Sequence, residues 1–159
     1  ELLKAKWEHI DFVNKTWLIP ETKRDGNSGH SREMIVYMSD QIISILNELK
    51  IIGGNEPYIF VGRKSGTHIS HNAFNTAQKN VLEFTTLSPF TIHDLRRTAS
   101  THLHEQGFNS DVIEASLNHT VKGIRGVYNK ASYKQQRIDM LQKWSDYIYG
   151  LIGSIPLVK

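Results

Sequence analysis

Residues 91–107 read TIHDLRRTASTHLHEQG, and the rest of the fold is interpreted outward from this stretch. Thr91 and Asp94 have the spacing of a capping box, with Asp94 in the place usually held by Glu or Gln, so a helix is predicted to begin here. Gly107 is typical of a helix end. The apolar positions between them, four residues apart, are Leu95, Ala99 and Leu103. This row predicts one helix face that packs against a core.

On both sides of this helix, short β-prone runs and helical patterns alternate, and the helical patterns dominate. The β-prone runs are residues 9–12, 16–19 and 34–38. The further helical segments are 1–7, from Ser39 or Asp40 to 53, from Ser70 through Val81, 110–117 and 132–150. Two more buried stripes are expected, Phe74, Ala77 and Val81 in one helix and Ile138, Leu141, Trp144 and Ile148 in the last. The fold class predicted is mainly α with a small antiparallel β-sheet.

The composition excludes several classes of protein. The chain has 159 residues, enough for one domain with its own core, and no cysteine. A disulfide scaffold, a thiol nucleophile and a cysteine zinc site are therefore excluded. The sequence contains no run of eighteen apolar residues, so no membrane partner is expected. The formal net charge of +3 permits a polyanionic partner such as DNA without requiring one.

Three weak signals stand near the central helix. His93 and Arg96 are three residues apart at a helix start, where the macrodipole favours anions, but a solvated face with a capping histidine explains them equally well. Asn118 follows a short helix at a point where a left-handed residue is often needed, and it would turn His119 back across the helix end. Tyr128 comes nine residues later, and a tyrosine is usually a half-buried packing residue.

Together, these residues resemble the tyrosine recombinases. Residues 93–96 are similar to the H-x-x-R box of that family, and residues 117–119 are similar to its L-G-H box, with Asn118 in place of Gly. Tyr128 falls at the usual interval for the nucleophile. The context of residues 128–133, followed by a helix that contains Trp144, resembles prophage and genomic-island integrases in particular.

The resemblance extends to the beginning of the chain. Residues 7–11 match a Trp-x-x-Ile-Asp segment of these integrases, which aligns Glu1 with the acidic residue of the family site. The first catalytic arginine would then lie three residues before Glu1, outside this chain. The hairpin lysine of the family maps onto Lys23, with Arg24 as a neighbouring competitor. Residues 1–159 are thus expected to form a catalytic domain truncated on its N-terminal side, without the upstream DNA-clamping and arm-binding domains.

The resemblance implies a metal-free, cofactor-free phosphoryl transfer. Tyr128 would attack the phosphate, Arg96 would clamp its oxygens, and Lys23 would protonate the departing 5′ oxygen. His93 and His119 can hydrogen-bond the phosphate or shuttle protons. The expected contacts with the DNA backbone are Arg97, Arg24 and Lys130. Arg97 has an ion pair as the alternative role.

The implied partners are double-stranded DNA attachment sites, a homotetramer on DNA, and accessory DNA-bending or directionality factors, in the bacterial cytoplasm at the nucleoid. A DNA-binding module without activity and a type IB topoisomerase are the rival interpretations. Four histidines set in pairs, His68 with His71 and His102 with His104, are expected to be exposed rather than zinc ligands, because no acidic or cysteine partners flank them at ligand spacing. Tyr133 is expected to pack rather than to react.

Overall fold

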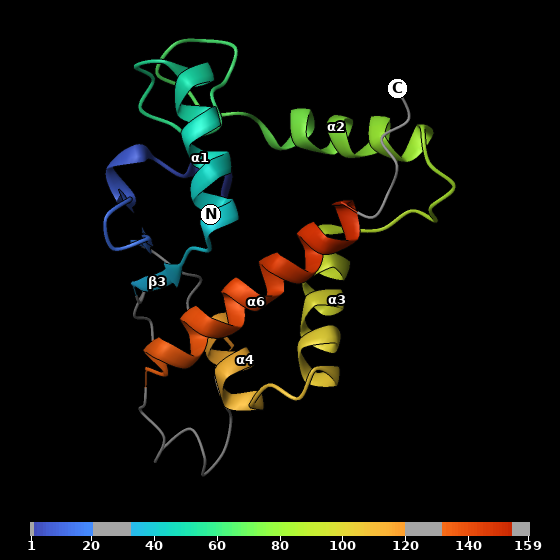
Figure 1. Cartoon of the computed structure of the whole chain (residues 1–159). Coiled ribbons are helices and arrows are strands. Elements are labelled where there is room, and N and C mark those ends of the chain that lie inside the picture. The colour runs from blue at the N-terminus through green and yellow to red at the C-terminus, as the bar shows by residue number, and fades with distance from the viewer. Residues whose placement is uncertain (1, 21–32, 120–131, 154–159) are drawn as a thin grey trace, which may run out of the picture.

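The computed structural model describes residues 2–20, 33–119 and 132–153. The 3₁₀ turns and strands are η1 Leu2–Lys4, η2 Trp7–His9, β1 Ile10–Asp11, β2 Thr16–Ile19 and β3 Met34–Tyr37. The helices are α1 Asp40–Gly53, α2 His71–Glu83, α3 Ile92–Glu105, α4 Ser110–Ser116 and α6 Lys134–Gly153. Figure 1 shows the small sheet at the left of the view, with α3 and α2 on the other side of the molecule. The predicted fold class, mainly α with a small antiparallel sheet, is confirmed.

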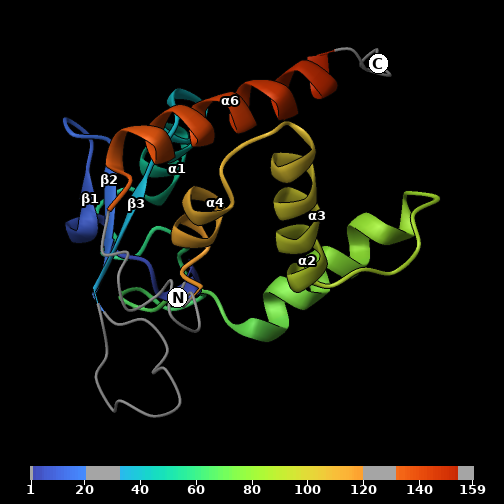
Figure 2. The ribbon, with the colours of Figure 1, turned by 90° about the horizontal axis from the view of Figure 1, so that it is seen from below.

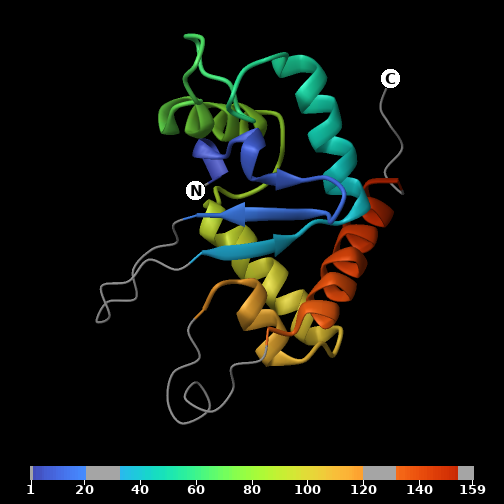
Figure 3. The ribbon, with the colours of Figure 1, turned by 90° about the vertical axis from the view of Figure 1, so that its left-hand side faces the viewer.

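The sheet has three antiparallel strands in the order β1-β2-β3. Figure 3 shows them side by side. Thr16 pairs with Tyr37 and Ile19 pairs with Met34 in the antiparallel register of β2 and β3. All three β-prone runs of the sequence contain a strand, and β2 has the predicted bounds.

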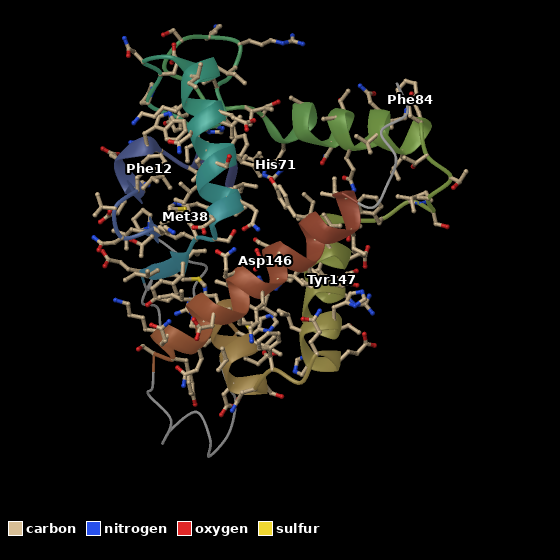
Figure 4. The ribbon with its side chains drawn as sticks, viewed as in Figure 1. Phe12, Met38, His71, Phe84, Asp146 and Tyr147 are labelled. Carbon is tan, nitrogen blue, oxygen red and sulfur yellow. The ribbon has the colours of Figure 1, made fainter. Side chains whose placement is uncertain are left out.

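Two clusters of buried side chains hold the described elements together. The first consists of Ala5, Met38, Leu46 and Ile59, and it joins the N-terminal turns, the end of β3 and α1. The second consists of Leu103, Val112, Ile113 and Met140, and it joins α3, α4 and α6. Polar contacts connect α1 with α6: Ser39 Oγ lies 2.6 Å from Ser145 Oγ, and Gln41 Nε2 donates to Asp146 (labelled in Figure 4) at 2.6 Å.

The N-terminal segment differs from the helix predicted for residues 1–7. Short 3₁₀ turns flank an extended stretch in which the Trp7 amide donates to the Pro57 carbonyl at 3.1 Å. The Ile59 amide donates to the Ala5 carbonyl at 2.9 Å. Because pairing with residues 57–59 occupies backbone groups that a continuous helix needs, tertiary contacts override the helix propensity here.

The helix at α2 was predicted correctly, but the burial of its stripe was not. Ser70 is the N-cap and accepts from the Ala73 amide at 3.2 Å, as expected. Figures 1 and 2 show α2 extending away from the other helices. Val81 is 55% exposed, and Phe84, labelled in Figure 4 at the far end of α2, is 88% exposed. A periodic apolar row therefore does not by itself show that a partner surface lies within the same chain.

Two other predicted stripes are only partly buried. In α3, Leu103 is buried but Leu95 is 54% exposed. In α6, the four predicted positions are half-buried, whereas Arg137 and Met140 are the buried ones. Leu141 and Trp144 of the predicted stripe pack against the second cluster, beside the buried Met140. No helix in the described residues is both long and apolar enough to cross a bilayer.

Candidate functional site at the end of helix α4

The first turn of α3 carries the predicted capping box. The Asp94 amide donates to Thr91 Oγ1 at 3.3 Å, and the Thr91 amide donates to Asp94 Oδ2 at 2.8 Å. The Thr91 amide and hydroxyl both donate to the Asp94 carboxylate, which is the main reason that the pKa of Asp94 lies below its ordinary value, with smaller contributions from Arg97 and His93. The cap fixes where α3 begins, and so it places His93 and Arg96 on the first two turns of the helix, three residues apart on one face.

The two consecutive arginines of α3 have different surroundings. Arg96 is half-buried, and its Nη2 donates to the carbonyl oxygen of Leu117, the C-cap residue of α4. Arg97 has a side chain 74% exposed, and its Nη1 lies 3.5 Å from Asp94 Oδ1. The ion pair expected as one role of Arg97 is thus present but weak. Arg96 is the arginine that connects α3 with the neighbouring α4, as their adjacent ribbons in Figure 2 illustrate.

The end of α4 is a Schellman turn. Asn118 has φ 52, the left-handed conformation predicted for it. The His119 amide donates to the Glu114 carbonyl at 3.0 Å, and the Asn118 amide donates to the Ala115 carbonyl at 3.4 Å. This is the hydrogen-bond pattern that satisfies the last carbonyls of a helix, and Asn tolerates the left-handed residue that the pattern requires. The turn brings His119 back over the last turn of α4.

The imidazole of His119 is held by a carboxylate that sequence reasoning missed. His119 Nδ1 lies 2.6 Å from Glu114 Oε2, with side chains 46% and 33% exposed. A separation of five residues is not an ordinary helical contact. Glu114 and His119 come into contact because the left-handed Asn118 reverses the chain between them. The sequence therefore predicts a contact between Glu114 and His119 only if a left-handed turn at Asn118 is assumed.

Arg137 is the second residue that sequence reasoning missed. It is 8% exposed at the start of α6, and its Nη2 donates to the Ile35 carbonyl at 2.8 Å while its Nε donates to Ser116 Oγ at 3.3 Å. Its guanidinium carbon lies 4.9 Å from the centre of the Tyr37 ring. Burial lowers the pKa of Arg137, but a guanidinium stays charged in proteins. The side chain therefore joins β3, α4 and α6 next to the end of α4 that Arg96 also contacts.

Comparison with known proteins identifies the family. The profile of the phage integrase family matches residues 1–135. The chain belongs to this family. The resemblance to tyrosine recombinases that the motifs indicated is thereby confirmed.

Bacterial prophage and phage integrases are among the curated proteins to which the chain is similar. Prophage integrase IntA of Escherichia coli strain K12 is 37% identical over 161 aligned residues, which cover 99% of this integrase chain and 37% of IntA. The integrase of enterobacteria phage P4 is 31% identical, with 93% of this chain and 36% of that protein covered. The chain thus spans little more than a third of the length of these relatives.

Two solved structures share the fold. The integrase from mycobacterium phage Brujita aligns with a TM-score of 0.67 at 15% identity, over 91% of this chain and 45% of that one. XerA recombinase aligns with a TM-score of 0.59 at 16% identity, over 96% of this chain and 52% of that one. At this level of identity, the likeness supports the fold and the placement of the helices.

The structure brings some of the predicted site residues together. Arg96 contacts the Leu117 carbonyl at the end of α4, two residues before His119, and His93 lies exposed on the first turn of α3 on the same face as Arg96. The other predicted site residues lie outside the described residues: Tyr128, Lys23, Glu1, Arg24 and Lys130. Their assignments remain predictions.

The residues set aside as unreactive have mostly structural surroundings. Of the four paired histidines, His71 and His104 are exposed as predicted, but His68 and His102 are half-buried. His68 packs against the edge of Tyr58, and His102 packs against the ring of Trp144. Within the described ranges, no group of three or more His, Cys, Asp or Glu side chains could hold a metal ion. Tyr133 is half-buried against the second cluster, which agrees with the packing role expected for it.

Proposed function

We propose that the protein containing this chain is a site-specific tyrosine recombinase that integrates or excises mobile DNA by cleaving and rejoining strands through a 3′-phosphotyrosyl link to Tyr128. The observation that carries the proposal is the convergence of Arg96 and His119 at the end of α4 in a chain of the phage integrase family. A fixed cation and an oriented imidazole are two of the groups that a metal-free attack on a phosphodiester requires.

The proposed chemistry needs no cofactor and no external energy. The Tyr128 oxygen forms a bond to the scissile phosphorus and passes its proton to a neutral imidazole of the site, His93 or His119, while the 5′ oxygen departs and takes a proton from Lys23. Arg96 donates to the non-bridging oxygens, which carry the growing negative charge. His93 and His119 donate to these oxygens when their rings are charged and accept a proton when they are neutral. In the return step, the 5′ hydroxyl of a partner strand attacks the same phosphorus, and Tyr128 leaves. Bond energy is conserved in the link, so ligation requires no nucleotide.

A phosphate contact at this site is supported by the charges around it. Arg96 and Arg97 both lie on α3 at a helix start, where backbone amides also favour an anion. The partners proposed are double-stranded DNA attachment sites, a tetramer of the protein on DNA, and accessory bending or directionality factors. Because the similar proteins come from bacterial prophages and phages, the proposed location is the bacterial cytoplasm at the nucleoid.

Residues 1–159 are proposed to act as the catalytic domain. In this proposal, Glu1 is the acidic member of the site, and the partner arginine of Arg96 comes from three residues before Glu1. Arg24, Arg97 and Lys130 are the proposed backbone contacts.

The test is covalent trapping on a nicked duplex built from the junctions that flank the integrated element. After strand cleavage at such a nick, a short 5′ product diffuses away and the tyrosyl link persists. The full-length protein should form an adduct that survives denaturant and disappears on protease treatment. A non-enzymatic DNA-binding module would form none. A type IB topoisomerase would form adducts on one site but would relax supercoils without a matched second site, whereas strand exchange here should require two.

A further inference from the structure

Glu114 contacts His119 through both its backbone and its side chain. The His119 amide donates to the Glu114 carbonyl at 3.0 Å, and His119 Nδ1 lies 2.6 Å from Glu114 Oε2. Both contacts have the same origin, because the left-handed Asn118 returns the chain over the third-last residue of α4. Glu114 is therefore the side chain that the turn itself selects as the neighbour of the imidazole.

The chemistry of this contact fixes the tautomer of the histidine. An ionised carboxylate can only accept hydrogen bonds, so Nδ1 must carry the proton that is shared with Glu114. The other ring nitrogen, Nε2, then faces away from Glu114 and has its lone pair, or a proton when the ring is charged, free for another partner. Without the carboxylate, a neutral imidazole in water favours the opposite tautomer, with the proton on Nε2.

We propose that Glu114 is a positioning residue for DNA cleavage, which selects the Nδ1–H tautomer of His119 and directs Nε2 toward the scissile phosphate. This inference rests on the proposed function, because it requires His119 to act on the phosphate. The same end of α4 is contacted by Arg96 through the carbonyl of Leu117, two residues before His119. Glu114 therefore orients His119 on the same turn to which Arg96 is bound.

The exposure of the pair makes the proposal testable without unfolding the protein. Half-exposed ion pairs contribute little to stability, so loss of the Glu114 carboxylate should leave the fold intact. A matched control exists on α3, where Glu105 Oε2 lies 3.5 Å from His102 Nδ1 in a second carboxylate–histidine pair. The control pair has the same chemistry, but neither member is a residue of the proposed site.

The experiment compares single-turnover cleavage and DNA affinity in the full-length protein. Glu114→Ala should slow formation of the covalent adduct by about 10- to 100-fold, the range typical for loss of a carboxylate that orients a functional histidine, with DNA affinity unchanged. Glu114→Gln keeps an acceptor oxygen at the same reach and should recover part of the rate. Glu105→Ala should cleave at the wild-type rate. Nitrogen-15 NMR of the neutral His119 ring should show Nδ1–H in the wild type and a shift toward Nε2–H in Glu114→Ala.

A double-mutant cycle separates positioning from a general structural role. In a His119→Ala background, Glu114→Ala should cause little further loss, because there is no ring left to orient. Equal slowing in both backgrounds, a wild-type rate in Glu114→Ala, or an unchanged tautomer would each overturn the proposal. A wild-type protein that forms no adduct on its junction DNA would contradict the proposed function itself, and the NMR result would still report whether Glu114 sets the tautomer.

Discussion

Replacement of Arg137 by alanine tests whether this side chain holds β3, α4 and α6 together. The guanidinium donates to the Ile35 carbonyl and to Ser116 Oγ, and it lies against the Tyr37 ring. Hydrogen bonds from a charged donor contribute about 1.5–3 kcal/mol each, and a cation against an aromatic ring contributes about 1 kcal/mol. The cost of keeping a charge out of water offsets part of this sum. We therefore expect Arg137→Ala to lower the free energy of unfolding by about 2–4 kcal/mol, since it leaves the Ile35 carbonyl without its partner.

The assay is urea unfolding of the chain, followed by far-ultraviolet circular dichroism. With an m-value of about 2 kcal/mol per molar urea, the midpoint should fall by about 1–2 M. Arg137→Met fills the same space without a charge and should cost less than Arg137→Ala, because a buried charge is expensive to maintain. Arg97→Ala, at a side chain 74% exposed, is the matched arginine control and should change stability by no more than about 0.5 kcal/mol. A loss below 1 kcal/mol in Arg137→Ala would refute the view that this side chain holds β3, α4 and α6 together.

Three further predictions concern the site. Lys23→Ala should slow cleavage of an ordinary phosphodiester far more than cleavage of one whose leaving oxygen is replaced by sulfur, because a thiolate departs without a proton; equal slowing on both substrates would leave Lys23 as a phosphate contact only. Cleavage should persist in excess EDTA, since the proposed donors are Arg, His and Lys side chains, and activity that returned only on addition of zinc or magnesium would contradict this. Asn118→Gly should keep the fold and the cleavage rate, whereas Asn118→Val should cost about 1–2 kcal/mol in thermal unfolding, because φ 52 is strained for a β-branched residue; equal stability of the two variants would count against the Schellman turn.

The sequence predicted helix ends well, because helix caps and turns depend on hydrogen bonds between residues that are close in the chain. Ser39, Ser70 and Thr91 all accept hydrogen bonds as N-caps, and Asn118 is left-handed, because each of these features depends on residues only a few positions apart. The motif spacing also identified the family, and the profile match confirms it.

Features that depend on distant contacts could not be read in this way. Arg137 has the sequence signature of an exposed helical arginine, and its burial depends on Ile35, about a hundred residues away. The chain between the two 3₁₀ turns is extended because residues 5–7 pair with residues 57–59. In the apolar row of α2, Ala77 and Val81 are exposed and not buried as predicted, because periodicity shows that a face is apolar without showing what covers it, and the side chain of Phe74 lies outside the described part of the structure.

The central claim is that Tyr128, and not the neighbouring Tyr133, forms the covalent link to DNA. The most direct measurement is mass spectrometry of the peptide that retains a nucleotide after the trapped adduct of the full-length protein is digested with protease and nuclease. The account predicts that the nucleotide is attached to Tyr128, that Tyr128→Phe abolishes the adduct while it still binds DNA, and that Tyr133→Phe still forms the adduct. A nucleotide attached to Tyr133, or an adduct that persists in Tyr128→Phe, would contradict it.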